Sequence, residues 1–497
     1  MVMSNNNSVG RGVVYLYIDS IATIFSGYIY WLIVSKFADP SIVGVSSSVI
    51  SLVFIFTAIA SIGISVGIQR TLSKNISINN LDNVKRIINS SFLILVLGLA
   101  GTFLTLFIIR EWIYELFRIN STFLIITMVL VSTMVIYSLL SAIIIPTLKV
   151  RIIAVSAVVA AIIKVIATLM LLVAGTGAVG ILIGFMLFPV ICIIALVIYI
   201  QKTLYSVLLK GNLKSQFGYV YDIFIAGFGF WIPTVITTIG IQLGTISVFL
   251  SNGSNQAGIY FIALAIMLGI TTIITVLSNI AYPTISSMTD GRKRASWKLI
   301  KVSLLLTTPL SIIIMFYSSD ILSLFGNDYQ NGSDTLIILL FSGIPTSILT
   351  GIGVLVYSYG FNKQFLSIGL FTSIPRVLLY FLLVPIFGGN GAALAYTIGA
   401  AAGFACSLII CRRVQMRLWW KQIILILLIP ILISIPFKMI HFNFILSIFF
   451  ILILTYLTFI KIRIIEDEDV AVISEFLPDP FERNILKLIE LIRRRKS

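Results

Sequence analysis

The sequence predicts an all-α integral membrane protein with about fourteen transmembrane helices, arranged as two six-helix lobes related by an internal repeat plus two extra helices. Hydrophobic residues make up 59% of the 497 residues and charged residues only 10%, whereas soluble domains average about 25% charged residues. The mean hydropathy is +1.11. This composition excludes a water-soluble enzyme and a disordered chain.

Fourteen apolar stretches are each long enough to cross the hydrocarbon core of a bilayer, which takes about 20 residues. They cover residues 12–35, 42–68, 87–109, 123–146, 152–174, 178–200, 223–250, 258–282, 298–318, 335–359, 366–387, 391–411, 421–440 and 442–460. Short glycine turns at residues 175–177 and 388–391 separate pairs of stretches that would otherwise form impossibly long helices.

The basic residues orient these spans. The chain has 34 Lys and Arg against 18 Asp and Glu. With the N-terminus inside, 28 basic residues fall in inside segments and 4 in outside segments, as the positive-inside rule requires. We therefore expect a multi-pass protein of the plasma membrane with both termini cytoplasmic. We expect contact with membrane lipids and no nucleic-acid partner, because no basic domain stands outside the spans.

The two halves of the chain share landmarks at a nearly constant spacing. Residues 37–44 (FADPSIVG) resemble residues 250–258 (LSNGSNQAG) at a shift of 214, and residues 177–180 (GAVG) resemble residues 388–391 (GGNG) at a shift of 211. Spans 1–6 and 7–12 therefore form two copies in the same orientation, as in many transporters.

The repeat sets the predicted domains. They are an N-lobe at 1–200, a cytoplasmic linker at 201–222, a C-lobe at 223–411, spans 13 and 14 at 412–462, and a cytoplasmic tail at 463–497 with an amphipathic helix.

Three charged residues lie deep within predicted spans, namely Asp19, Lys164 and Arg376. A charge at mid-bilayer costs about 3 kcal/mol, so such residues are candidates for function. Lys164 follows Arg151 by 13 residues, and Arg376 follows Lys363 by 13 residues. The two cations therefore occupy equivalent depths in spans 5 and 11, one in each half.

Small and polar residues share a helical face with each of these charges, which indicates a helix partner or a watery cavity. The faces contain Ala157, Ala160, Ala161 and Thr168 beside Lys164; Gly369, Thr372, Ser373 and Tyr380 beside Arg376; and Tyr15, Ala22, Ser26 and Tyr30 beside Asp19. Span 7 offers Thr234, Thr238, Gln242 and Thr245.

We interpret this pattern as a central, net-cationic cavity. Lys164 and Arg376 would face a phosphate or pyrophosphate, Asp19 would tune them or take part in ion coupling, and Tyr380, Gln242 and Thr238 would line the lumen. The alternative is an internal ion pair of Asp19 with one cation, which would only hold helices in register.

Catalytic and metal-binding residues are not expected. His441 is the single histidine, and Cys192, Cys406 and Cys411 do not have the spacing of a metal site.

The whole layout resembles a Wzx-type polysaccharide flippase of the multidrug/oligosaccharidyl-lipid/polysaccharide (MOP) exporter superfamily. The resemblance covers nearly the entire chain and rests on the six-plus-six-plus-two arrangement, residues 37–44 after span 1, and three further motifs. These are residues 258–260 (GIY), 281–284 (AYPT) and 389–395 (GNGAALA).

The resemblance implies two lobes that rock around a central cavity. It implies a cargo of oligosaccharide on polyprenyl (pyro)phosphate, flipped from the inner to the outer leaflet, and coupling to an ion such as Na⁺ or H⁺ or to the membrane potential, without a cofactor. Glycan-assembly proteins would be partners. The chain departs from the family at Gly244, where family members often carry Asp.

Three alternatives stay open. A drug or cation antiporter of the same superfamily would need acidic residues in its lumen, and a membrane glycosyltransferase would need a sizeable outside loop. The third is a subunit without a transport role of its own.

Overall fold

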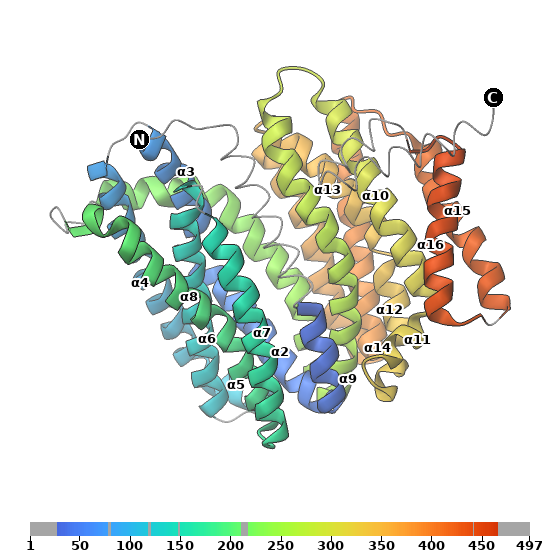
Figure 1. The fold of residues 1–497 in the computed structure, drawn as a ribbon, viewed down its shortest axis with the longest axis horizontal. Coiled ribbons are helices and arrows are strands. Elements are labelled where there is room, and N and C mark those ends of the chain that lie inside the picture. The colour runs from blue at the N-terminus through green and yellow to red at the C-terminus, as the bar shows by residue number, and fades with distance from the viewer. Residues whose placement is uncertain are drawn as a thin grey trace. The chain divides into compact units, whose positions relative to one another are not determined.

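The computed structural model describes residues 27–77, 81–117, 121–147, 150–209, 217–440 and 442–465. Within these ranges every regular element is a helix (Figure 1), because a backbone in lipid must satisfy its polar groups within the segment. The elements after helical residues 27–37 are α2 (Pro40–Ala60), α3 (Ile64–Ser77), α4 (Leu81–Ile108), α5 (Arg110–Phe117), α6 (Ser121–Ile144), η1 (Ile145–Thr147), α7 (Arg151–Val173), α8 (Gly177–Leu209), α9 (Phe217–Ser287), α10 (Arg292–Phe316), α11 (Ser318–Ser323), η2 (Asn327–Gly332), α12 (Ser333–Leu340), α13 (Gly343–Ser358), α14 (Asn362–Arg413), α15 (Trp420–Met439) and α16 (Phe444–Lys461).

Eleven helical stretches of the described residues are long and apolar enough to cross a membrane. Two of them, in α9 and α14, contain a break in the helical backbone. Counted as two segments each, these give thirteen, which correspond in order to predicted spans 2–14. Span 1 (12–35) begins outside the described residues, so the number fourteen stays a prediction. The all-helical, multi-pass fold class is confirmed.

Glycines make the breaks. Gly253 in α9 has φ 85° and ψ 176°, and Gly388 in α14 has φ 55° and ψ −133°. Gly175 and Gly177, between α7 and α8, also have positive φ values of 78° and 56°. Residues with a Cβ rarely adopt this backbone region. The turn predicted at residues 175–177 is confirmed. The turn predicted over residues 388–391 is narrower than expected, because only Gly388 departs from helical geometry and residues 389–391 are helical.

The chain divides into two compact units. The first contains residues 1–262 and 373–396, and the second contains residues 263–372 and 397–497. In the first unit α7 packs along α8, and α6 packs against both α8 and α2 (Figure 1). The predicted lobe, linker and tail boundaries follow the internal repeat instead and stay predictions; residues 466–497 of the tail lie outside the described part.

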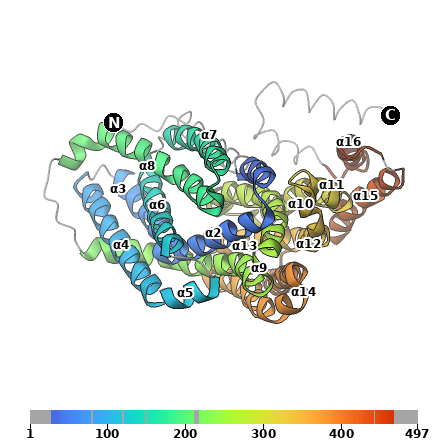
Figure 2. The same cartoon turned by 90° about the horizontal axis from the view of Figure 1, so that it is seen from below.

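The second unit has its core around α10, which packs against α13 and α15. Ile300, Leu305, Ile352, Ile426 and Phe459 are each at most 1% exposed in this core. Helices α15 and α16 lie side by side (Figure 2). Burial of these aliphatic and aromatic side chains fixes the start of α10 beside the connection between α14 and α15.

Candidate functional site

Lys164 lies inside the first compact unit, on α7, with only 6% of its surface exposed. Its ammonium nitrogen is 3.9 Å from the centre of the Tyr30 ring, 4.6 Å from that of Phe185 and 5.9 Å from that of Phe188. Ring faces carry partial negative charge, so they attract the ammonium group. Lys164 is thus enclosed by aromatic rings from residues 27–37 and α8.

The local structure around Lys164 follows from the predicted face of α7, which is buried as expected. Thr168, one turn after Lys164, donates a hydrogen bond to the Lys164 carbonyl oxygen at 2.8 Å. Thr168 also lies 3.5 Å from the Tyr30 hydroxyl oxygen, and that hydroxyl donates to the carbonyl oxygen of Ile181 at 3.1 Å. These contacts hold the Tyr30 ring over the ammonium group.

Arg376 belongs to the same unit and is 3% exposed. The central carbon of its guanidinium lies 3.7 Å from the centre of the Tyr396 ring, a stacking contact that a planar guanidinium favours. Its Nε is buried and has no hydrogen-bond partner among the described residues. The Arg376 Nε–H group is therefore available to donate a hydrogen bond to a ligand.

Tyr380 follows Arg376 by one helical turn and is fully buried. Its hydroxyl donates a hydrogen bond to the Gly240 carbonyl oxygen at 3.0 Å. The Tyr380 and Tyr260 hydroxyls converge on Gly244, where an added Cβ would lie 3.0 Å and 2.5 Å from their oxygens. Both tyrosines lie within electrostatic reach of the Arg376 guanidinium.

Lys164 and Arg376 have similar surroundings, although different aromatic residues cover them. Each is a buried cation covered by aromatic side chains, and among the described residues neither has a carboxylate in an ion pair. Arg110 pairs with Glu111 and Lys438 with Asp320, both away from these two cations. Opposite charge would compensate a buried cation best, so the described surroundings of both cations suit an added anion, either a ligand or the carboxylate of the alternative ion pair.

The remaining predicted lumen residues are placed as follows. Thr238 and Gln242 are half-buried on α9. Asp19 lies outside the described residues, so the alternative of an Asp19 ion pair stays open. The sequence did not indicate Phe185 or Tyr396 as site residues, and it gave Tyr260 only as part of the 258–260 motif, because the sequence does not show which aromatic rings lie near a buried charge.

Comparison with known proteins shows the family to which the chain belongs. The sequence family described as "Polysaccharide biosynthesis protein" matches residues 48–333, more than half of the chain. The chain belongs to this family. A search of the curated proteins gives no significant match for the chain.

The solved structures show which fold the chain has. It resembles the lipid II flippase MurJ in an inward closed conformation, with a TM-score of 0.72, 17% identity, and coverage of 90% of this chain and 98% of that one. It also resembles an inward-facing multidrug resistance MATE family transporter of the MOP superfamily, with a TM-score of 0.63, 13% identity, and coverage of 81% and 97%.

A third structure comes from Pyrococcus furiosus. It is a MOP superfamily transporter described as having a binding pocket of reverse polarity, with a TM-score of 0.58, 15% identity, and coverage of 82% and 95%. The chain therefore has the fold that these three structures share, as the sequence resemblance implied.

Proposed function

We propose that this chain flips an oligosaccharide linked to polyprenyl (pyro)phosphate from the inner to the outer leaflet by alternating access, for surface polysaccharide or glycoprotein synthesis. The observation that carries the proposal is the pair of buried cations, Lys164 and Arg376, each covered by aromatic rings. Family membership supports the glycan, and the fold supports transport.

The rings suit a site that must open and close. A cation over a ring gains about 0.5–2 kcal/mol, enough to keep an empty site closed but less than a phosphate offers. A phosphate oxygen can therefore replace the Tyr30 or Tyr396 ring when cargo enters. Arg376 adds a planar fork that binds phosphate through two hydrogen bonds.

The physical demands on a flippase fit these residues. A hydrophilic sugar needs a polar path through the hydrocarbon layer, to which Thr238, Gln242 and Tyr380 would contribute. The prenyl chain can stay in lipid. Binding must stay modest, because cargo held too tightly would not leave, and exchangeable ring contacts meet that demand.

Coupling to an ion and location in the plasma membrane are part of the same proposal. Asp19 is the candidate for coupling to Na⁺ or H⁺, because a carboxylate within a predicted span can take up a proton or bind a cation. We place the protein in the plasma membrane with both termini cytoplasmic, working beside glycan-assembly partners.

The experiment is flipping in proteoliposomes. A fluorescent polyprenyl-pyrophosphate oligosaccharide is incorporated, and its protection from an outside quencher or glycosidase is followed over time. Wild type is compared with Lys164→Ala, Arg376→Ala and the control Lys363→Gln, which removes an exposed cation away from the site. We expect flipping to fall at least tenfold in both alanine variants and to be unchanged in the control.

The second candidate is a drug or cation antiporter, which the likeness to MATE transporters favours. A cationic dye serves as the competing cargo. Dye movement without glycolipid flipping would replace the flippase by the antiporter. Flipping that survives both alanine substitutions would keep the flippase and leave the two cations a structural role. Glycosyl transfer has less support, since the solved structures that share this fold include a flippase and MATE transporters.

A further inference from the structure

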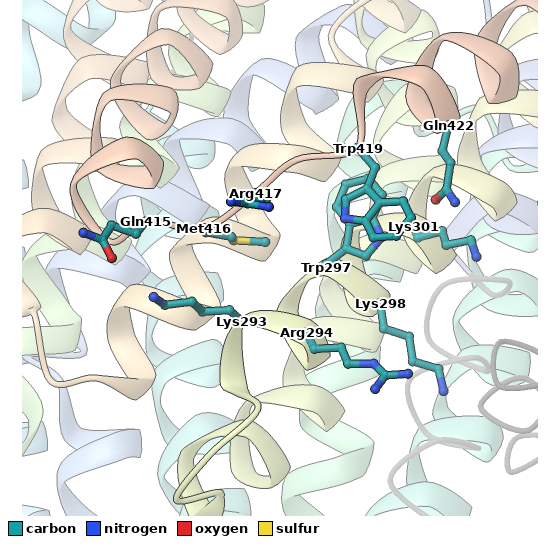
Figure 3. Close-up of a pocket in the computed structure, with 10 residues that line it drawn as sticks. All are labelled: Lys293, Arg294, Trp297, Lys298, Lys301, Gln415, Met416, Arg417, Trp419 and Gln422. Carbon is teal, nitrogen blue, oxygen red and sulfur yellow. The ribbon is translucent and has the colours of Figure 1, made fainter.

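The second compact unit contains a cavity of about 450 Å³ between the first turns of α10 and the connection that follows α14 (Figure 3). Gln415 has φ 55°, and its turn brings Trp419 across to Trp297 of α10, where the two rings stack with centroids 6.4 Å apart. Three of the cations that line the cavity already have interaction partners, so we infer no ligand there; they are Arg294, Lys298 and Lys301.

The first compact unit contains a helix break inside an apolar stretch that the sequence predicts to be one span. Residues 61–63 separate α2 from α3, within the predicted span 42–68. Ile62 has φ 42° and Gly63 has φ 71°. A β-branched residue rarely adopts a positive φ, and residues 41–77 contain no proline that would force a break. Contacts from elsewhere in the unit therefore hold the backbone in this strained form.

The break removes the helical donor of the Ala58 carbonyl oxygen. In a continuous helix the Ile62 amide would donate to this oxygen, but it donates to the Ile59 carbonyl oxygen at 3.3 Å. The Ala58 oxygen accepts from Nε1 of Trp231 on α9 at 2.8 Å, and from the Ser61 hydroxyl at 2.9 Å. Trp231 thus takes the place of the Ile62 amide.

Beyond the break, α3 and α9 meet backbone against backbone within the first unit. A Cβ added to Gly63 would lie 2.8 Å from the Gly227 carbonyl oxygen, and a Cβ added to Gly67 would overlap the Ile223 carbonyl oxygen. Each pair on one helix is one turn apart, so the two helices run antiparallel here. Small residues allow this close approach. Because backbones make the contact, it can separate without the repacking of interdigitated side chains.

The rest of α3 is held by its own half of the chain. It packs along α4 and α6, and the Ser65 and Ser138 hydroxyl oxygens share a hydrogen bond at 2.6 Å. This support does not depend on α9. Helix α3 can therefore keep its form when its contact with α9 separates.

We propose that residues 58–63 are a switch with two states, in which Trp231 and the Ile62 amide compete for the Ala58 carbonyl oxygen. In the state described here Trp231 holds the oxygen, the helix is broken, and α3 lies against α9. In the other state the Ile62 amide takes the oxygen, α2 and α3 join into one helix, and α3 moves away from α9.

Opposing contributions keep the two states close in free energy. The broken state has the hydrogen bond from Trp231 and carries the strained φ of Ile62. The joined state removes this strain, loses the bond and places Gly63 within a helix, which glycine disfavours. A single substitution in the switch therefore shifts the population of the two states.

In the flippase proposed above, on which this role rests, the switch controls one end of the transport path. Arg70 and Lys74 lie further along α3, so the charge count places this end at the cytoplasm. The opposite end of α2 contacts α9 through Gly44 and Gly258. Separation at the switch alone opens the path to the inner leaflet, from which the cargo enters.

The experiment measures the distance between two spin labels on the full-length protein in lipid nanodiscs. The labels are attached at Ser73→Cys on α3 and Tyr221→Cys on α9, both exposed positions, after replacement of the three native cysteines by alanine. The distance distribution gives the ratio of molecules with α3 separated from α9 to molecules with the two in contact. Wild type is compared with Trp231→Phe, Gly63→Ala, the double variant Trp231→Phe/Ile62→Gly, and the controls Gly101→Ala and Phe228→Leu.

Trp231→Phe keeps a ring and loses the N–H donor, so we expect the ratio to rise about threefold to tenfold. Gly63→Ala should raise it as well, because alanine disfavours φ 71°, favours the helix and presses on Gly227. Adding Ile62→Gly to Trp231→Phe should reverse the rise, because glycine adopts a positive φ without strain and disfavours the joined helix.

The two controls should leave the ratio unchanged. Nothing lies within 4 Å of a Cβ added to Gly101. Phe228→Leu alters the ring beside Trp231, at a centroid distance of 6.0 Å, and keeps the indole donor.

Equal ratios in wild type and Trp231→Phe would overturn the switch. A rise in Trp231→Phe that Ile62→Gly does not reverse would also overturn it, because α3 would then separate with the break intact. Glycolipid flipping by the same proteins tests the cargo independently. Shifted distances without any flipping by wild type would keep the switch and reject the proposed cargo.

Discussion

Gly44 and Gly258 lie 214 residues apart, the spacing of the internal repeat, and they pack backbone against backbone within one compact unit. A Cβ on Gly44 would lie 2.9 Å from the Gly258 amide nitrogen, and a Cβ on Gly258 would lie 3.0 Å from the Gly44 amide nitrogen. The predicted repeat pairs these two glycines, and a contact of this kind is expected near an axis that relates two copies. The start of α2 therefore packs directly against the segment of α9 after Gly253.

The first prediction concerns this contact. Gly44→Ala should destabilise the protein by about 1–3 kcal/mol, because the atoms in the way are backbone atoms that cannot turn aside. Thermal unfolding of the purified protein measures the effect. Gly101→Ala in α4 is the control, since nothing lies within 4 Å of its added Cβ and alanine favours the helix. Equal unfolding temperatures for the two variants would mean that the contact is loose.

The second prediction tests the ring over Lys164. Tyr30→Leu should cost about 1–2 kcal/mol more than Tyr30→Phe, because phenylalanine keeps the ring and loses only the hydrogen bond to Ile181. Thermal unfolding of both variants gives the difference. In a Lys164→Met background the difference should shrink, which shows that it depends on the charge. A difference that persists without the ammonium would assign the effect to packing alone.

The sequence identified the two cations but not their surroundings, for a physical reason. A charge in an apolar span carries so large a cost that it is visible without a structure. Tyr396 and Phe185 are ordinary in a chain with 12% aromatic residues, because rings also face lipid. Only the packing of α7, α8 and α14 distinguishes the rings that cover a charge.

The helix breaks, in contrast, could be predicted from the sequence. Gly388 stands between two apolar stretches too long to be one span, so length alone predicts a turn there. The cavity beside α10 could not be predicted in this way. The basic residues 292–301 were read as topology, and the left-handed Gln415 that brings Trp419 across to Trp297 has no sequence signature.

The third prediction concerns that turn. Gln415 has φ 55°, a conformation that costs a residue with a Cβ about 1 kcal/mol and glycine almost nothing. Gln415→Gly should therefore raise the stability by about 0.5–1 kcal/mol, measured as an upward shift of the unfolding temperature. Gln415→Ala keeps the strained backbone and serves as the control. A gain from alanine equal to that from glycine would locate the cost in the side chain instead of the backbone.

The last prediction concerns the packing around Gly244, where the hydroxyl ends of Tyr260 and Tyr380 fill the space that a side chain would need. Gly244→Ala should destabilise the protein by about 1–3 kcal/mol, because its Cβ would press on the Tyr260 oxygen at 2.5 Å. Tyr260→Phe should cost less than Gly244→Ala, because the Tyr260 hydroxyl lies beside the Tyr380 hydroxyl but makes no hydrogen bond of standard geometry.

The double variant Gly244→Ala/Tyr260→Phe tests whether the Tyr260 oxygen occupies the space beside Gly244. Removing the Tyr260 oxygen makes room for the new methyl group, so the double variant should recover most of the stability that Gly244→Ala loses, a coupling that additive effects would not produce. Gly244→Ala/Tyr380→Phe should recover less, because Tyr380 also loses its hydrogen bond to the Gly240 carbonyl oxygen. Unfolding temperatures of the two double variants and of the three single variants Gly244→Ala, Tyr260→Phe and Tyr380→Phe measure the coupling. Additive losses in both pairs would show that the tyrosines do not occupy the space beside Gly244 in the protein in solution.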